Sequence, residues 1–189
     1  DDGSYDTRFA RIWKKLYPTI QVLQNKKNSG FAKAVNLGIK NATGDLILLL
    51  NNDCHMDNAS WLTTMVNTLE NDKLDMTAPA GGRMNKKWEY IDEVRTKGVE
   101  FTYLPGFCLL IKREVFDKIG NIPEYFGAGF WEDNLFCYRA KRAGFKLGIS
   151  ENVGINHLPH STFKEAGIDI RKQYLGNREM FLNIMKGEK

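Results

Sequence analysis

The chain contains few cysteines, and their spacing matches no disulfide pattern. Its 189 residues include only Cys54, Cys108 and Cys137, which lie far apart and outside any CxxC pattern. An odd number of cysteines at such spacing argues against a disulfide framework and fits a reducing compartment. The apolar residues around Cys108 and Cys137 predict that both thiols are buried as small hydrophobic side chains.

Long apolar runs are also missing. No run approaches the about 20 residues that a membrane-spanning helix needs, and no stretch resembles a signal peptide. The net charge of +4 is mild and the basic residues fall in scattered doublets, which argues against dedicated nucleic-acid binding. We therefore expect a cytoplasmic protein, with peripheral contact at the inner membrane face left open. The length allows one domain with a substantial core.

The apolar periodicity predicts helices that alternate with strands in the first half of the chain. Such alternation is typical of βαβ units and a parallel sheet. The expected helices cover residues 7–17, 31–40, 61–69, 113–119, 131–143 and most of 162–185. The expected strands cover residues 19–23, 46–50, 75–80, 99–104, 107–111, 145–149 and 153–156. The polar segment 83–97 is interpreted as a loop over a site.

The apolar run Leu46–Leu50 ends abruptly at Asn51, Asn52 and Asp53. Its length fits a buried, central parallel strand, since a helix usually needs twice as many residues. Open α/β sheets bind ligands beyond the carboxyl ends of their strands. An aspartate flanked by amides at that position could hold a hard divalent cation against phosphate oxygens. The alternative is that Asp53 only caps the following turn.

Two adjacent carboxylates, Glu132 and Asp133, open a predicted helix directly after the glycine-rich stretch Gly127–Gly129. Neighbouring acids shift each other's pKa values, and a partly buried acid can take a proton from a hydroxyl. Trp131 beside them would help to exclude water. The alternative is simple capping, because the N-terminus of a helix stabilises acidic side chains.

Two further stretches carry weaker signals. Residues Asn25–Gly30 precede a predicted helix, and such a loop can bring backbone N–H groups to phosphates, although many βα loops look the same. His157 could add one ligand to a cation–phosphate site, whereas a zinc site with His160 is disfavoured because Cys54 and His55 are distant in sequence. An ordinary surface turn explains the two histidines equally well.

Taken together, these stretches resemble the family two inverting glycosyltransferases, particularly the rhamnosyltransferase-like branch. The order and spacing of the motifs carry this resemblance over almost the whole chain, and His157 stands where the family often has a late histidine. The matching stretches are D-D-G-S-x-D at 1–6, Asn25–Asn41 with Asn28, Gly30, Asn36 and Gly38, L-N-N-D at 50–53, Leu104–Gly120, and E-D followed by Arg139 and Gly144. The resemblance implies a GT-A fold, a Rossmann-like mixed and mostly parallel sheet flanked by helices, here without the usual first strand and helix.

The resemblance implies metal-assisted transfer of a sugar, with inversion, from a nucleotide-diphosphate donor to an acceptor hydroxyl. The donor would carry UDP, dTDP or GDP, the cation would be Mn²⁺ or Mg²⁺, and the acceptor would be a glycan, a lipid-linked glycan or a protein. Asp133 would be the catalytic base and Glu132 would support it. The implied nucleotide-binding residues are Asp2, Asn25, Gly30, Asn36, Asn52 and Asp53, the acceptor-binding residues are Gly106, Phe107 and Trp131, and the metal ligands are Asp53 and His157.

We expect one catalytic domain with a nucleotide-binding part at residues 1–80, an acceptor-binding part at 81–160 and a helical segment at 161–189. The motif has Asn51 where the DxD form has aspartate, so an alternative is a binding module for carbohydrate or nucleotide whose catalysis is weakened. A nucleotidyltransferase fits less well, because no glycine- and lysine-rich phosphate loop stands near the start. Aromatic residues of the loops 83–97 and 123–130, together with Trp131, could stack on sugar rings, and half of them are expected to be buried instead.

Overall fold

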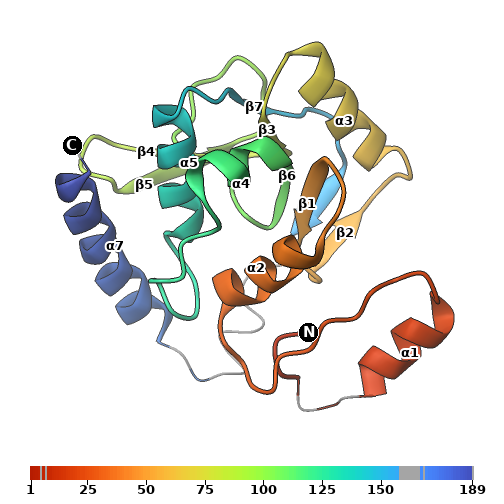
Figure 1. Ribbon diagram of the computed structural model, residues 1–189. Coiled ribbons are helices and arrows are strands. Elements are labelled where there is room, and N and C mark those ends of the chain that lie inside the picture. Colours follow the sequence, from red (N-terminus) through yellow and green to blue (C-terminus); the bar gives the residue numbers. More distant parts are fainter. Residues whose placement is uncertain (5, 7, 158–166, 168, 189) are drawn as a thin grey trace.

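The computed structural model describes every residue except 5, 7, 158–166, 168 and 189 (Figure 1). The described helices are α1 (Arg8–Leu16), α2 (Phe31–Asn41), α3 (Trp61–Asn71), α4 (Arg113–Ile119), α5 (Glu132–Arg142) and α7 (Ile170–Gly187). The described strands are β1 (Leu46–Leu50), β2 (Cys54–Met56), β3 (Met76–Ala78), β4 (Gly81–Met84), β5 (Tyr90–Val94), β6 (Cys108–Lys112), β7 (Leu147–Ile149) and β8 (Ile155–His157).

A four-stranded mixed sheet with the order β1-β6-β3-β7 forms the centre of the protein. β6 runs antiparallel to both β1 and β3, whereas β3 and β7 are parallel. β1, β3 and β7 therefore share one direction, which confirms the expected mixed, mostly parallel sheet. Two separate antiparallel ribbons, β2 with β8 and β4 with β5, complete the strand pairing among the described residues.

The apolar run of β1 packs against helices on both faces of the sheet. Ile47 and Leu49 belong to a core cluster that includes residues of α2, α4 and α5. Leu46 and Leu48 pack on a second cluster that contains Met65 of α3. Because successive side chains of a strand point to opposite faces, the apolar residues at 46–49 serve both faces of the sheet, whereas Leu50 is exposed. β1 nevertheless lies at the edge of this sheet, so the expectation of a central strand is wrong.

Three other predicted segments differ from the structure. Residues 19–23 form no strand. The neighbouring backbone is that of Asp1, which forms one hydrogen bond with Leu23 and one with Asn25, each 2.9 Å long. Two such bonds do not make a strand pair. Residues 83–97 contain β5 and part of β4 instead of a loop, and their polar composition reflects a ribbon whose β5 strand is largely open to water. Residues 99–104 contribute only one bridge, between Tyr103 and Gly82.

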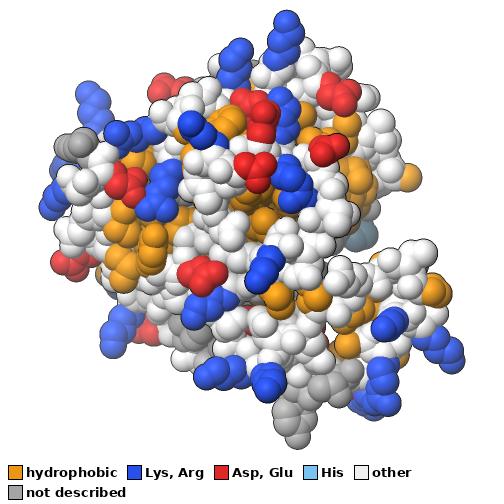
Figure 2. All heavy atoms as spheres, in the orientation of Figure 1, with side chains coloured by type: hydrophobic (Ala, Val, Ile, Leu, Met, Phe, Trp, Pro, Cys, Tyr) orange, Lys and Arg blue, Asp and Glu red, His pale blue; other side chains and the backbone are white. Residues whose placement is uncertain are grey.

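The predicted first helix forms, but it stands away from the rest of the chain (Figure 1). None of its described residues is buried, and side chains such as Phe9, Trp13 and Leu16 are more than half exposed. Figure 2 shows this segment as a separate lobe at the lower right, with apolar and basic side chains on its surface. Within the described part of the chain, no helix is both long enough and apolar enough to span a membrane.

The three thiols are free, as the spacing predicted. Cys108 and Cys137 are fully buried, which confirms their role as small hydrophobic core residues. Burial raises the pKa of both thiols to about 12, so neither is ionised at neutral pH.

Candidate active site

Asp53 and His157 meet at one end of the β2–β8 ribbon. The register pairs Cys54 with His157, which brings Asp53, one residue before β2, beside the imidazole. Asp53 Oδ1 lies 3.1 Å from His157 Nε2, within ion-pair distance of a protonated imidazole, and neither buried atom has a hydrogen-bond partner among the described residues. Buried polar atoms are normally satisfied. A carboxylate oxygen and an imidazole nitrogen left facing each other are therefore suited to share a divalent cation.

Phe107, one residue before β6, fixes the position of the imidazole. The rings of Phe107 and His157 are stacked, with centroids 4.6 Å apart and planes inclined by 12°. The Phe107 carbonyl oxygen accepts a hydrogen bond of 2.8 Å from Asn51 N–H and another of 3.4 Å from Cys54 Sγ. The L-N-N-D turn, Phe107 and His157 thus form one packed unit.

Asp133 contacts the same dipeptide, Gly106–Phe107, through the backbone of Gly106. Gly106 N–H donates to Asp133 Oδ2 at 3.2 Å, and Asn134 N–H donates to Oδ1 at 2.8 Å. A Cβ at position 106 would lie 3.3 Å from the ring of Phe31 and 3.8 Å from Asp133 Cβ, so little space remains there for a side chain. Gly106–Phe107 therefore links the Asp53–His157 pair to the carboxylate of Asp133.

Burial changes the proton affinity of both acids at the start of α5. The side chain of Glu132 is buried, and its Oε2 has no hydrogen-bond partner among the residues described. Burial, and next the charge of Asp133, raises the pKa of Glu132. Burial also raises the pKa of Asp133, against the opposing effect of its N–H donors. A carboxylate with a raised pKa is a better proton acceptor, as deprotonation of a hydroxyl requires.

The turn before these acids has an unusual backbone. Phe130 and Trp131 adopt left-handed conformations, with φ of 72° and 80°, which cost roughly 1–2 kcal/mol for each non-glycine residue. Such strain persists only where the surroundings hold it, and active sites are common locations. Trp131 itself is 1% exposed and its indole N–H donates to Tyr174 O at 3.0 Å. The structure therefore places this predicted acceptor-binding residue inside the contact with α7, with no open surface.

Asp2, Asn25 and Gly30 come together at the start of α2. The Asp2 carboxylate accepts hydrogen bonds from the backbone N–H and the hydroxyl of Ser29, from Gly30 N–H and from Asn25 Nδ2, at 2.6–3.1 Å. Burial acts to raise the pKa of Asp2, but these hydrogen bonds together outweigh it and lower the pKa. A Cβ on Gly30 would lie 2.3 Å from Gly127 O. Gly30 therefore lets this loop touch the turn that precedes α5.

Asn36 and Asn52 are placed differently. Asn36 is buried, where its Nδ2 donates to Ile122 O and Glu124 Oε1, each at 2.8 Å, and its Oδ1 accepts from Ile122 N–H at 3.0 Å. Its polar atoms hold the segment that leads to the glycine-rich turn and are not free for a nucleotide in this structure. Asn52 is exposed in the turn before β2. His160 lies outside the described residues.

The sequence reasoning missed the contribution of α7. Asn177 is buried on this helix and bonds to the turn before α5. The available signal was an asparagine one turn before Phe181, on the apolar side of a predicted helix. Of the aromatics considered for sugar stacking, Phe126 and Trp131 are buried, Trp88 and Phe130 are half-buried, and Tyr90 and Tyr125 are exposed.

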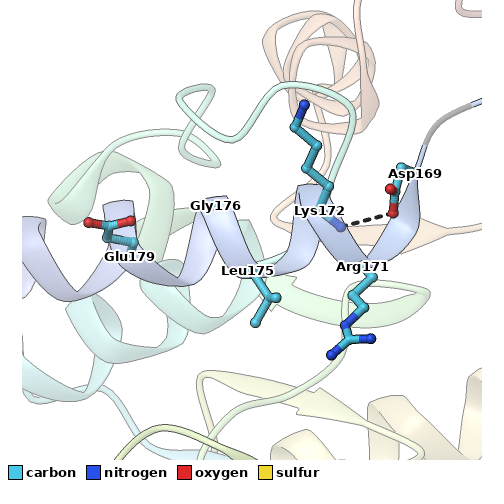
Figure 3. Close-up of a pocket in the computed structure, with 6 residues that line it drawn as sticks. All are labelled: Asp169, Arg171, Lys172, Leu175, Gly176 and Glu179. Carbon is cyan, nitrogen blue, oxygen red and sulfur yellow. Dashed lines mark hydrogen bonds between the residues drawn. The ribbon is translucent and has the colours of Figure 1, made fainter.

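An open pocket runs along the other side of α7 and is distinct from this site (Figure 3). It is lined by Asp169, Arg171, Lys172, Leu175, Gly176 and Glu179. All six belong to α7 or to its N-cap, where the Asp169 carboxylate accepts from Lys172 N–H at 3.0 Å. None of the predicted site residues lines this pocket.

Two curated sequences show what the chain is similar to. Glycosyltransferase AglE of Haloferax volcanii is 24% identical over 185 residues, which cover 92% of this chain and 59% of AglE. The low-salt glycan biosynthesis hexosyltransferase Agl10 of the same organism is 29% identical over 82 residues, 40% of this chain and 26% of Agl10. The chain therefore spans only part of the length of these relatives.

Two solved structures share the fold. GalNAc-T7 with UDP, GalNAc and Mn²⁺ superposes with a TM-score of 0.66 at 17% identity, over 80% of this chain and 34% of GalNAc-T7. The mannosyltransferase PcManGT of Pyrobaculum calidifontis, in complex with GDP-Man and Mn²⁺, gives 0.65 at 16% identity, over 88% of this chain and 48% of PcManGT. These likenesses establish the GT-A fold.

The sequence model of Glycosyl transferase family 2 matches residues 1–120, which include Asp2, Asp53 and Gly106. Glu132, Asp133 and His157 lie beyond the matched residues. The match nevertheless extends over more than half of the chain, and the chain therefore belongs to glycosyl transferase family 2.

Proposed function

We propose that the chain is the catalytic domain of an inverting, metal-assisted glycosyltransferase that moves a sugar from a nucleotide-diphosphate donor to an acceptor hydroxyl. One observation carries this proposal: Gly106–Phe107 contacts the Asp53–His157 pair through the Phe107 ring and contacts Asp133 through Gly106 N–H, so the two carboxylates occupy separate positions. Inversion requires the attacking hydroxyl and the leaving diphosphate on opposite faces of the anomeric carbon. A base separated from the phosphate-binding residues meets this requirement.

Asp133 is the base in this proposal. The acceptor oxygen forms its bond to the anomeric carbon while the bond from that carbon to the diphosphate breaks, and Asp133 takes the hydroxyl proton. Gly106 N–H orients one carboxylate oxygen. Burial and the charge of Asp133 raise the pKa of Glu132, and the protonated form of Glu132 avoids two adjacent negative charges in this buried position.

Asp53 and His157 would hold a divalent cation, because their facing atoms are buried and lack hydrogen-bond partners among the described residues. The described residues contain no group of three or more His, Cys, Asp or Glu side chains suited to a metal. Phosphate oxygens of the donor and water would therefore complete the coordination, as is usual for Mg²⁺. When bound, such a cation offsets the negative charge on the departing diphosphate. The Mn²⁺ in the GalNAc-T7 and PcManGT structures supports this assignment.

The nucleotide would bind near the start of α2, where Asp2, Asn25 and Gly30 converge, and reach Asn52 and Asp53. The UDP of GalNAc-T7 and the GDP-Man of PcManGT support a nucleotide donor, with dTDP as a further base to test. Gly106 and Phe107 would border the acceptor, while Asn36 and Trp131 act indirectly by holding loops. The glycan biosynthesis named for Agl10 supports a glycan acceptor, with a lipid-linked glycan or a protein as further acceptors to test.

We likewise assign residues 1–80 mainly to the nucleotide and residues 81–160 to the acceptor, and we assign a supporting role to the segment 161–189, which contains α7. The proposed compartment is the cytoplasm, and the three free thiols support a reducing environment.

Calorimetric titration with UDP, dTDP and GDP, with and without Mn²⁺, tests the donor side of the proposal. We expect one nucleotide to bind only with Mn²⁺, and Asp53→Ala and His157→Ala to weaken that binding at least tenfold. Asp57→Ala is the matched control, because this exposed aspartate stands near the same ribbon. Equal affinity with and without Mn²⁺ would contradict the metal assignment, and binding without any sugar transfer would favour the binding-module alternative.

A further inference from the structure

The turn that leads into the catalytic acids is held by one buried side chain of α7. Asn177 is 6% exposed, and its Nδ2 lies 2.8 Å from Phe126 O, 2.8 Å from Gly129 O and 3.1 Å from Phe130 O. Three carbonyl oxygens that converge on one point repel each other unless a donor lies between them. The carboxamide N–H groups of Asn177 supply that donor.

The backbone that Asn177 holds does not adopt this shape by preference. Phe130 and Trp131 both have positive φ angles, in a region that residues with a Cβ atom rarely occupy. Glu132 and Asp133 follow directly in α5. The direction in which α5 begins, and thus the position of the Asp133 carboxylate against Gly106 N–H, depends on this turn.

Neighbouring residues of α7 contact the same turn. Gln173 Nε2 donates to Phe126 O at 2.8 Å, and Tyr174 O accepts from the indole N–H of Trp131 at 3.0 Å. The ring of Phe181 packs on Trp131 with centroids 5.0 Å apart. Residues 173, 174, 177 and 181 lie on one face of a helix, and α7 runs beside α5 in Figure 1.

We propose that Asn177 is a positioning residue for glycosyl transfer: it binds the carbonyl groups of residues 126–130 and so fixes Asp133 in its working orientation. Asn177 does not itself reach the reacting atoms, because its side chain is buried between α7 and the turn. The inference rests on the proposed function, in which Asp133 is the base.

The test compares Asn177→Ala with Asn183→Ala, a matched control on the exposed side of the same helix. Sugar transfer is measured with the UDP-, dTDP- or GDP-linked donor that wild type uses, together with nucleotide affinity and the pH dependence of kcat. For Asn177→Ala we expect kcat to fall about 10- to 100-fold, since small displacements of a catalytic group have effects of this size. Nucleotide affinity is expected to change by no more than about twofold, which is much less than the expected change in kcat.

The pH profile separates positioning from simple loss of folded protein. If the turn loosens and water reaches Asp133, the midpoint of the rate profile moves down toward the ordinary pKa of aspartate, because burial is what raises it. A lower active fraction would reduce kcat with no change of midpoint, and this result overturns the proposal. Unchanged kcat in folded Asn177→Ala overturns it as well.

Gln173→Ala provides a second variant in case Asn177→Ala does not fold. It removes one of the two side-chain donors to Phe126 O and leaves Asn177 in place. We expect a smaller loss of kcat with the same direction of midpoint shift, and wild-type values for both would contradict the proposal. Wild type and Asn183→Ala are assayed in parallel, so an inactive wild type counts against the proposed function. If wild type is active and Asn177→Ala has the same kcat and midpoint, the result counts only against the role of Asn177 and leaves the proposed function intact.

Discussion

The ring of Phe107 lies flat against the imidazole of His157, with 4.6 Å between the centroids. Phe107→Leu keeps an apolar side chain of similar volume but removes the flat surface that orients the imidazole. We expect Mn²⁺-dependent nucleotide binding to weaken about tenfold, as with other residues that orient metal ligands. The free energy of unfolding is expected to change by less than about 1.5 kcal/mol. Phe116→Leu, at a similarly buried ring far from His157 in the core, is the calorimetric control, and equal effects of the two variants would contradict the prediction.

Substitution of Gly30 and of Gly38 by alanine is expected to change the free energy of unfolding in opposite directions. Gly30 has a φ of +92° and a Cβ there would lie 2.3 Å from Gly127 O, so Gly30→Ala is expected to lower the free energy of unfolding by more than about 2 kcal/mol. Gly38 lies within α2 with no atom near its Cβ position, so Gly38→Ala is expected to raise it by roughly 0.5–1 kcal/mol. Urea unfolding measures both. A neutral Gly30→Ala would show that the two loops do not touch.

The buried carboxyl of Glu132 makes stability depend on pH. Its pKa in the folded protein is raised above the ordinary value of 4.5 to about 8, so folding favours the protonated form. This contribution is complete below pH 4.5 and is lost as the pH rises through about 8. Glu132→Gln should therefore make the protein more stable than wild type at pH 9 by more than about 1.4 kcal/mol, the equivalent of one pKa unit. Urea unfolding at pH 5 and pH 9 checks this, and an identical pH dependence in the variant would refute it.

The pH dependence of transfer follows from Asp133. Burial raises its pKa from the ordinary 3.8 to about 6, and only the ionised form accepts a proton. We therefore expect kcat to rise with pH through a midpoint near 6 and to remain high at neutral pH. The profile is recorded on wild type at saturating donor, and a rate that is flat between pH 4 and pH 7 would remove Asp133 from consideration as the base.

Local signals predicted most of the helices and the strands of the central sheet. The apolar run 46–50 and the period of residues 61–69 depend only on neighbouring residues, and both elements form as expected. The insertion of β6 between β1 and β3 could not be predicted this way, because strand pairing joins residues far apart in the sequence. The β4–β5 ribbon was missed because β5 lacks the apolar face that marks a strand packed on a core.

In the candidate site, too, the residues could be predicted from the sequence, whereas their arrangement in space could not. The residue types and the family resemblance pointed to Asp53, His157 and Asp133, but not to the register of β2 and β8 that brings Asp53 to His157. The resemblance implied Trp131 at the acceptor, and the structure buries this side chain against α7. Asn177 was missed because a sequence pattern predicts a helix without showing which turn the helix contacts.

Asp133→Asn removes the proposed base and leaves the rest of the site in place. Asparagine keeps the size of the side chain and an oxygen that can accept from Gly106 N–H, but it cannot take a proton from the acceptor. We expect kcat to fall about 100- to 10,000-fold, the usual contribution of a general base, while the affinity for nucleotide with Mn²⁺ stays at the wild-type value. Transfer by Asp133→Asn at the wild-type rate would contradict the assignment of Asp133 as the base.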